Sequence, residues 1–248
     1  MRSLLAVLAV AITLRLHAGV VYDFVTTVES PRSRTKQTGR IFIDGQSYRA
    51  DLNGRGGRDI DVVISRDGDQ TAIFVDLQKC FWSYRTRIGP TRSSSYFHLP
   101  TDTANVIIGK PSVSHRIEGT EAFGEFTATK HVIEIAYRIV GLSAGSPVRG
   151  HIEAKATIWT VESLPPLPMR RELRTGHESV DTRIARVSSD IGGMIVHHEL
   201  EVTRAYDGGI AQTERTITNV HNLRVTELSP SLFVVPEDAI YVQRAPGS

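Results

Sequence analysis

The 248-residue sequence contains a single cysteine, Cys80. One cysteine cannot form an intramolecular disulfide, and a lone cysteine in a strand-like segment is typically a small buried hydrophobic residue. The sequence also lacks a G-x-x-x-x-G-K-[ST] loop and a dinucleotide-binding fingerprint, so nothing in it supports a nucleotide-dependent enzyme. We therefore expect a fold stabilised by packing alone, with no cofactor.

An excess of charge of one sign is also missing. Lysine and arginine number 29 against 27 for aspartate and glutamate, and two of the basic residues, Arg2 and Arg15, lie in an N-terminal segment that we expect to be removed. A dedicated nucleic-acid-binding protein needs a basic face to displace counterions from phosphates. We therefore expect no nucleic-acid partner. Apolar residues make up 40% and charged residues 23% of the chain, which is enough for a globular core.

The one long apolar run is at the N-terminus. Residues 1–3 carry one positive charge, on Arg2, the eleven residues 4–14 are almost entirely apolar, and Leu16-His17-Ala18 is a possible cleavage site before Gly19. A membrane-spanning helix needs about 20 apolar residues, so this run is too short to cross a bilayer. We predict that residues 1–18 are a signal peptide and that the protein is periplasmic or secreted. No later apolar run approaches the required length, so we expect no stable membrane span after export.

Most of the remaining chain shows the two-residue period of strands with one buried face. The clearest case is the segment in which Ile133, Ile135, Tyr137 and Ile139 alternate with polar residues, and residues 152–158 show a similar pattern that predicts its antiparallel partner. The dipeptides Asp44-Gly45 and Asp67-Gly68 each separate two apolar-rich runs, which predicts two hairpins because glycine accepts the positive φ of a tight turn. We expect about ten strands in one domain, residues 19–248.

One segment has a helical period instead. Val180, Ile184, Val187 and Ile191 fall on one helical stripe, and Gly192-Gly193 supplies a stop, so we predict a helix over 178–191. Residues 96–111 have no clear period, and we predict a single helical turn at 104–108. The predicted fold class is mainly β with one or two helices: a curved antiparallel sheet, or open half-barrel, covered by helix.

The sequence contains one catalytic-looking motif. Residues 141–145, Gly-Leu-Ser-Ala-Gly, match the G-x-S-x-G pattern of a serine-hydrolase nucleophile elbow, with Ser143 as the nucleophile. An elbow must be followed by a helix that helps to form the oxyanion hole, whereas Ser146-Pro147 leads into another predicted strand. A hairpin loop accounts for the same residues. We therefore predict no catalytic residue and keep a hydrolase using Ser143 as a remote alternative.

Histidine and arginine clusters are interpreted in the same way. His197 and His198 are adjacent in a predicted strand and point to opposite faces, so they are poorly placed to chelate one ion. The remaining histidines lack metal-ligand spacing, and we predict no metal site. Between residues 168 and 186, basic and acidic residues are mixed, which is more typical of a solvated face than of an anion site: Arg170, Arg171, Arg174, Arg183 and Arg186 among Glu172, Glu178 and Asp181.

The apolar and aromatic residues of the predicted strands are too many for one short helix to cover. If the sheet curves, they line either an apolar groove for a hydrophobic ligand or a filled core. Large side chains such as Trp82 and Trp159 filling the concavity would favour a protein-interaction module. The candidate groove-lining residues are Phe24, Ile41, Ile43, Phe74, Trp82, Tyr84, Ile133, Ile135, Tyr137 and Ile158.

Several short motifs resemble the LolA/LolB-like superfamily of periplasmic lipoprotein carriers, and an exported branch of it in particular. They follow the predicted signal peptide and cover most of the mature chain: Gly39-Arg40-Ile41-Phe42-Ile43-Asp44-Gly45, Tyr48-Arg49-Ala50, Gly119-Thr120-Glu121-Ala122-Phe123-Gly124, Ala156-Thr157-Ile158-Trp159-Thr160 before Leu164-Pro165, and Phe233-Val234-Val235-Pro236 before Tyr241.

The resemblance implies an open antiparallel half-barrel whose concave apolar face holds acyl chains, and it brings no catalytic residue. This chain has fewer predicted helices than the carriers. We therefore expect a non-catalytic protein that binds a hydrophobic small molecule or lipid in the periplasm or outside the cell. The alternative is an envelope interaction or sensor module that uses the same sheet to bind another protein.

Overall fold

A computed structural model describes residues 18–53, 60–65, 71–76, 80–85, 106–143, 146–166, 175 and 177–242. The predicted signal peptide, apart from Ala18, and the predicted turn at Asp67-Gly68 lie outside these residues. Within them, no helix has the length and apolar character needed to cross a membrane. The chain divides into two compact units, which are described separately. The first comprises Met1–Phe24, Gln37–Gly89 and Val220–Ser248, and the second Val25–Lys36 and Pro90–Asn219.

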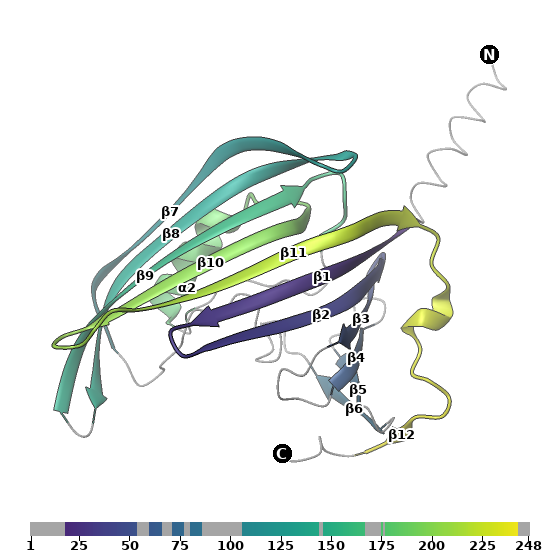
Figure 1. Cartoon of the computed structure of the whole chain (residues 1–248), viewed down its shortest axis with the longest axis horizontal. Helices are drawn as coiled ribbons and strands as arrows, with labels where there is room; N and C mark the ends of the chain where they lie inside the picture. Colours follow the sequence, from purple (N-terminus) through teal and green to yellow (C-terminus); the bar gives the residue numbers. More distant parts are fainter. Residues whose placement is uncertain are drawn as a thin grey trace. The chain divides into compact units, whose positions relative to one another are not determined.

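The second unit is built on long antiparallel strands (Figure 1). Strands β7, β8 and β9 pair in chain order, β10 returns beside β9, and β11 pairs with β10. Their bounds are β7 Val106–Phe123, β8 Phe126–Ser143, β9 Ser146–Val161, β10 Met194–Tyr206 and β11 Gln212–Thr226. The pairing of β8 with β9 confirms the hairpin predicted from their alternating patterns.

The first unit is a meander of shorter strands, in which β2, β3, β4, β5 and β6 pair antiparallel in chain order and β12 adds parallel to β6. The predicted hairpin at Asp44-Gly45 is confirmed, with Asp44 opposite Ser47 and Gly45 at φ 55°. The bounds are β1 Gly19–Ser30, β2 Ser33–Asp44, β3 Ser47–Asn53, β4 Ile60–Ser65, β5 Thr71–Asp76, β6 Cys80–Arg85, the 3-10 helix η2 Pro230–Phe233 and β12 Ile240–Tyr241.

The hydrogen-bonded order of the twelve described strands is β12-β6-β5-β4-β3-β2-β1-β11-β10-β9-β8-β7. The order is open, with β12 and β7 at its two ends, and all of the pairs with a defined register are antiparallel except β12 with β6. This confirms the predicted class, a mainly β chain with an open antiparallel sheet. Strands β1, β2 and β11 contribute residues to both units. The single-domain organisation stays a prediction.

The core of the second unit lies between the sheet and helix α2 (Glu178–Ser188). Val180 and Ile184 of α2 are fully buried against alternate residues of β8, β9 and β10, and Val187 packs at the margin of the same cluster. We call the face of β7–β10 that packs against α2 the inner face. The predicted helix is confirmed, although it ends at Ser188, three residues before the predicted end.

The first unit has its own core, and its packing depends on one glycine. Phe24 is 4% exposed, and a Cβ atom built on Gly39 would lie 2.6 Å from its ring and even closer to the carbonyl oxygen of Asp51. The absence of a side chain at Gly39 therefore makes room for the aromatic ring. The other buried apolar residues of this unit are Val20, Val21, Tyr22, Ile41, Ile43, Tyr48, Ala50, Ile64, Val220 and Phe233.

One predicted element is wrong. Residues 106–108, placed in a helical turn by the sequence, begin the eighteen-residue strand β7. Local propensity is overridden here because the segment pairs with β8, with Val106 opposite Val140 and Ile107 opposite Ile139.

Candidate ligand-binding site

The candidate site starts from an irregularity in β7. Ile108 pairs with Arg138 and Ser112 with Ala136, so Gly109, Lys110 and Pro111 together face the single residue Tyr137 of β8. Gly109 has φ 74°, which glycine adopts without strain, and Pro111 has no N–H to donate to the ladder. The sequence thus places a bulge within the strand, and such bulges redirect side chains away from the regular pleat.

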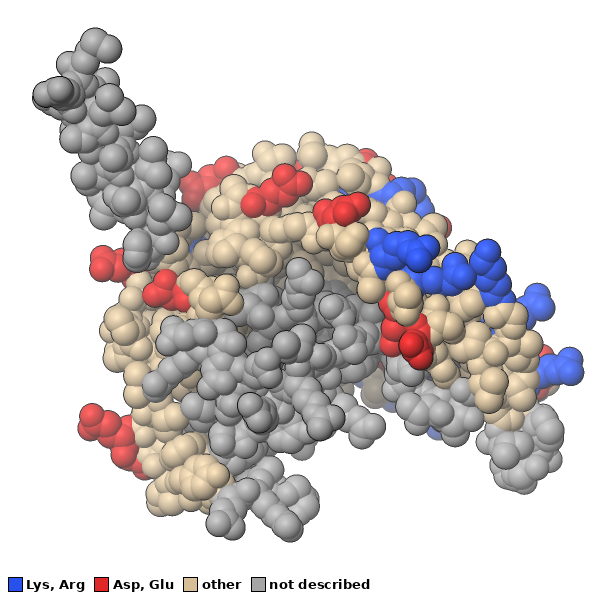
Figure 2. Space-filling view, turned by 180° about the vertical axis from the view of Figure 1, so that it is seen from behind, with Lys and Arg blue, Asp and Glu red and all other residues tan. Residues whose placement is uncertain are grey.

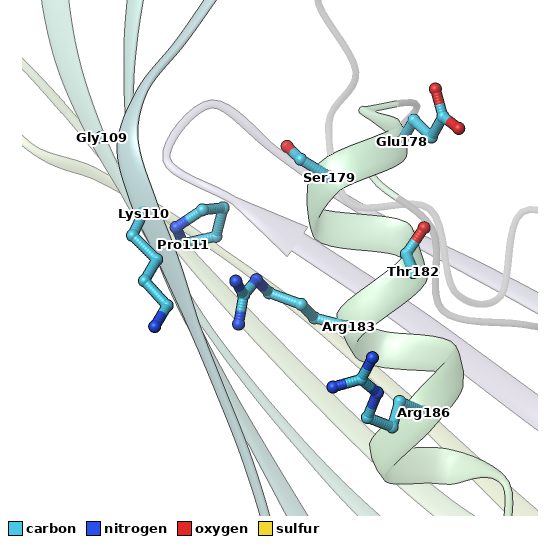
Figure 3. A pocket seen from close by; sticks show the side chains of 8 residues that line it. All are labelled: Gly109, Lys110, Pro111, Glu178, Ser179, Thr182, Arg183 and Arg186. Carbon is cyan, nitrogen blue, oxygen red and sulfur yellow. The ribbon is translucent and has the colours of Figure 1, made fainter.

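The bulge faces helix α2 across a groove of about 630 Å³. The groove is lined on the strand side by the three bulged residues and on the helix side by residues from the first to the last turn of α2 (Figure 3). The lining residues are Gly109, Lys110, Pro111, Glu178, Ser179, Thr182, Arg183 and Arg186.

The groove carries more positive than negative charge. Arg183 and Arg186 extend from α2 toward β7, Lys110 projects from the bulge, and Glu178 points away from the strand (Figure 3). Among the described residues, no carboxylate forms an ion pair with any of the three cations. Figure 2, seen from behind the view of Figure 1, shows several Lys and Arg side chains close together, with Asp and Glu side chains beside some of them. The excess of cations in the lining makes the groove attractive to anions.

Apolar side chains flank the groove on both elements. Ile107 and Val113 precede and follow the bulge on β7, and Val187 lies one helical turn after Arg183 on α2. All three are partly buried and pack against the core cluster. Cationic side chains thus line the groove, and these three apolar residues form its apolar margin.

The start of α2 is fixed by polar contacts next to the groove. The backbone N–H and the hydroxyl of Thr175 both donate to Asp181 Oδ1, at 2.6 and 2.7 Å, and the N–H of His177 donates to Thr175 Oγ1 at 3.1 Å. The Tyr137 ring meets the His177 ring edge-on, 6.1 Å between centroids. Burial, with a further contribution from Asp181, raises the pKa of Tyr137 to about 12, so this phenol stays neutral.

Two histidines that looked scattered in the sequence meet on the inner face. His115 Nε2 lies 3.1 Å from His131 Nδ1, and His131 Nε2 lies 3.1 Å from the hydroxyl of Thr160. Burial is the main cause that lowers the pKa of His131, and the neighbouring His115 acts in the same direction. Sequence spacing could not reveal this pair, because the contact depends on the register between β7 and β8.

The adjacent histidines of β10 point to opposite faces, as predicted. His197 contacts the Trp159 ring at 4.4 Å between centroids and Asn219 Oδ1 at 2.7 Å, on the face away from α2. His198 is 1% exposed on the inner face, and burial lowers its pKa to about 3. In the described part of the chain, no three His, Cys, Asp or Glu residues converge as metal ligands do.

The predicted groove residues fall into both units. Ile133, Ile135, Tyr137 and Ile158 lie in the core cluster on the inner face of the second unit. Phe24, Ile41 and Ile43 are buried in the first unit. Phe74 pairs in register with Trp82, and Tyr84 follows on the same strand, but these three side chains lie outside the described ones. The role of the ten residues in binding stays a prediction.

The hydrolase motif falls at the β8–β9 hairpin. Ser143 pairs in register with Ser146, and the chain continues directly into β9. No helix follows Ser143, so the helix N-terminus that an elbow requires is not formed there. The hairpin-loop interpretation therefore accounts for the motif.

Neither a family model nor a curated protein matches the sequence. Three solved structures are similar over most of their length. An uncharacterized conserved protein from Thermus thermophilus is 12% identical, covers 95% of this chain and 99% of its own, and gives a TM-score of 0.39. A DUF1329 family protein from Desulfovibrio piger is 11% identical, with coverages of 92% and 94% and a TM-score of 0.33.

The third structure is a putative outer membrane lipoprotein-sorting protein domain from Vibrio parahaemolyticus. It is 8% identical, covers 91% of this chain and 94% of its own, and gives a TM-score of 0.32. Similarities of this size identify no family.

Proposed function

We propose that the protein binds a hydrophobic ligand, a lipid or another molecule with an acyl chain, without catalysis and after export to the periplasm or the cell exterior. The observation that carries the proposal is the groove between β7 and α2, which opens beside the apolar inner face. A single eleven-residue helix packs over this part of the sheet in the described chain. The apolar residues at the margin of the groove, Ile107, Val113 and Val187, are only partly buried.

One of the two tryptophans considered as fillers of the concavity, Trp159, does not occupy it, and the side chain of the other, Trp82, lies outside the described ones. Ile158 belongs to the core cluster, whereas Trp159 contacts His197 and lies 5.2 Å from Lys130 Nζ on the opposite face. The large indole therefore takes up no space on the inner face. An acyl chain bound along the partly buried residues at the margin of the groove, Ile107, Val113 and Val187, would gain about 0.8 kcal/mol for each methylene group removed from water.

The proposal is tested by native mass spectrometry and solvent extraction of the exported, untagged protein. We expect a copurified phospholipid or fatty acid in near-stoichiometric amount. The variant Thr182→Trp places an indole in the groove and should reduce the lipid recovered, because Thr182 lines it. The matched control is Ala185→Trp, at an exposed position of α2 outside the groove lining, which should leave recovery unchanged.

Two results would contradict the proposal. Protein that is free of lipid, and that fails to take up added palmitate, has no acyl-binding function. Equal lipid recovery from the two tryptophan variants would place the ligand somewhere other than the groove. Circular dichroism of both variants checks that each one is folded.

A second function, binding of an envelope protein, is favoured by one observation. Strand β7 ends the strand order and exposes large apolar side chains, with Val106 67% and Ile117 62% exposed. An extended segment of a partner would add to such an edge through main-chain hydrogen bonds. A photo-crosslinking residue at position 117 would then capture one defined protein in the periplasm. The same residue at position 201, exposed on the interior strand β10, should capture none.

A further inference from the structure

We infer that the groove between β7 and α2 selects an anionic head group, a phosphate or a carboxylate, on the ligand. This inference rests on the proposed function and adds the chemical class of the ligand. For Arg183 and Arg186 it replaces the solvated face of mixed charge that the sequence predicts, whereas Arg170, Arg171 and Arg174 lie outside the described residues.

The structure separates the charges that the sequence mixes. The acidic residues of the first turns of α2 do not neutralise the groove, because Asp181 accepts two hydrogen bonds from Thr175 and Glu178 points away from β7 (Figure 3). Arg183 and Arg186 are three residues apart and therefore share one helix face. Their guanidinium groups present planar sets of donors that match phosphate and carboxylate oxygens.

The third cation comes from a distant part of the sequence. Lys110 is exposed at the β7 bulge, opposite the face of α2 that carries the two arginines. The bulge holds this residue outside the regular ladder, with Gly109 at positive φ on one side and buried Pro111 on the other. Cations thus line both walls of a groove of about 630 Å³, which is large enough for a head group.

The apolar margin fixes the orientation of the ligand. Arg183 is half-buried, and Val187, one turn further along α2, packs against the core cluster. When the anionic head group of a ligand contacts Arg183 and Arg186, its acyl chain therefore lies next to the apolar margin. The ligand class that satisfies both parts is an anionic amphiphile.

The test compares three probes that carry the same acyl chain, using protein from which bound lipid has been removed. The probes are palmitoyl lysophosphatidylglycerol, palmitate and zwitterionic palmitoyl lysophosphatidylcholine, with binding measured by calorimetry. We expect an anionic probe to bind about tenfold more tightly than the zwitterionic one, and this preference to shrink as salt rises from about 50 to about 500 mM. The two anionic probes distinguish a phosphate site from a carboxylate site.

The double variant Arg183→Gln, Arg186→Gln should lose the preference and keep its binding of lysophosphatidylcholine. Lys110→Gln removes a cation at an exposed strand position and should reduce the preference without affecting the helix. The matched control is Arg138→Gln, Arg149→Gln, which removes two exposed arginines of β8 and β9 that do not line the groove. The control should retain the full preference.

Each other outcome has a distinct meaning. Equal binding of all three probes to the unmodified protein overturns the anionic head group and leaves the proposed function intact. A preference that survives both groove variants overturns the assignment to this groove. If no probe binds, the proposed function fails, and this inference fails with it.

Discussion

At the scale of single residues, burial of histidine makes stability depend on pH. Burial lowers the pKa of His198 to about 3 and lowers that of His131, whereas a histidine in the unfolded chain titrates near 6.5. Below about pH 6.5 the unfolded state therefore binds protons that the native state does not, and the free energy of unfolding falls as the pH falls. The stabilising effect is complete above pH 6.5.

The first prediction concerns this pH window. Between about pH 6.5 and pH 5, His198 alone should lower the free energy of unfolding, with a slope that steepens toward a limit of about 1.4 kcal/mol for each pH unit. The variant His198→Gln, which does not titrate, should show a flatter dependence in urea titrations at several pH values. An unchanged slope in His198→Gln would show that burial does not lower the pKa of this histidine in the native state.

The second prediction concerns Gly39. The variant Gly39→Ala should destabilise the protein by about 1–3 kcal/mol, because its Cβ would collide with the Phe24 ring and with the carbonyl oxygen of Asp51. Gly192→Ala is the control, since a Cβ there meets no atom within 4 Å. Urea denaturation measures both variants. Equal stability of the two would mean that β2 shifts freely enough to accept the methyl group.

At the scale of elements, α2 depends on its buried stripe and on its first turn. The third prediction is that Ile184→Ala, at a residue 1% exposed, lowers the free energy of unfolding by about 2–5 kcal/mol through the cavity it leaves. Thr182→Ala, on the exposed side of the helix, should change it by less than about 0.5 kcal/mol. Urea denaturation measures the free energy of unfolding of both variants. A small effect of Ile184→Ala would show that α2 contributes little to the stability of the core.

The fourth prediction tests the contacts that fix the helix start. Thr175→Ala removes the hydroxyl that donates to Asp181 and accepts from the N–H of His177, and should cost about 1–2 kcal/mol. Thr175→Ser keeps both hydrogen bonds and should recover most of the loss. Thermal denaturation of the three proteins compares them. Equal loss in the alanine and serine variants would assign the effect to the lost methyl group instead.

A strand or helix was predictable from the sequence where one of its faces is buried and the opposite face is exposed. Strand β8 and helix α2 have this asymmetry, so their periods of two and of three to four residues are visible in the sequence. Strand β7 lies at the end of the strand order and is exposed at most of its positions, and the bulge at 109–111 interrupts its alternation, so residues 104–111 show no strand period. The groove was not predictable, because Lys110 and Arg183 are far apart in sequence and meet only through the packing of β7 beside α2.

At the scale of the whole molecule, the sequence predicts a signal peptide and offers one possible cleavage site, Leu16-His17-Ala18 before Gly19. The fifth prediction is that the protein, expressed with its own N-terminus in a Gram-negative host, is recovered from the periplasm with Gly19 as its first residue. N-terminal sequencing and intact mass measure this. Leu8→Arg interrupts the apolar run and should retain the precursor in the cytoplasm, whereas Leu8→Val should be processed normally. A periplasmic protein that still begins at Met1 would contradict the prediction.

The chain-order pairing of β7, β8 and β9 has a consequence for folding. The β7–β8 and β8–β9 turns are short, with Phe123 opposite Phe126 and Ser143 opposite Ser146, so we expect these hairpins to form first, from local contacts. The pairing of β10 with β9 closes a longer loop that contains α2, and we expect it to come later. Until α2 and β10 pack, the apolar face of β8 and β9 would be uncovered, and we expect the refolding chain to be most prone to aggregate in that interval.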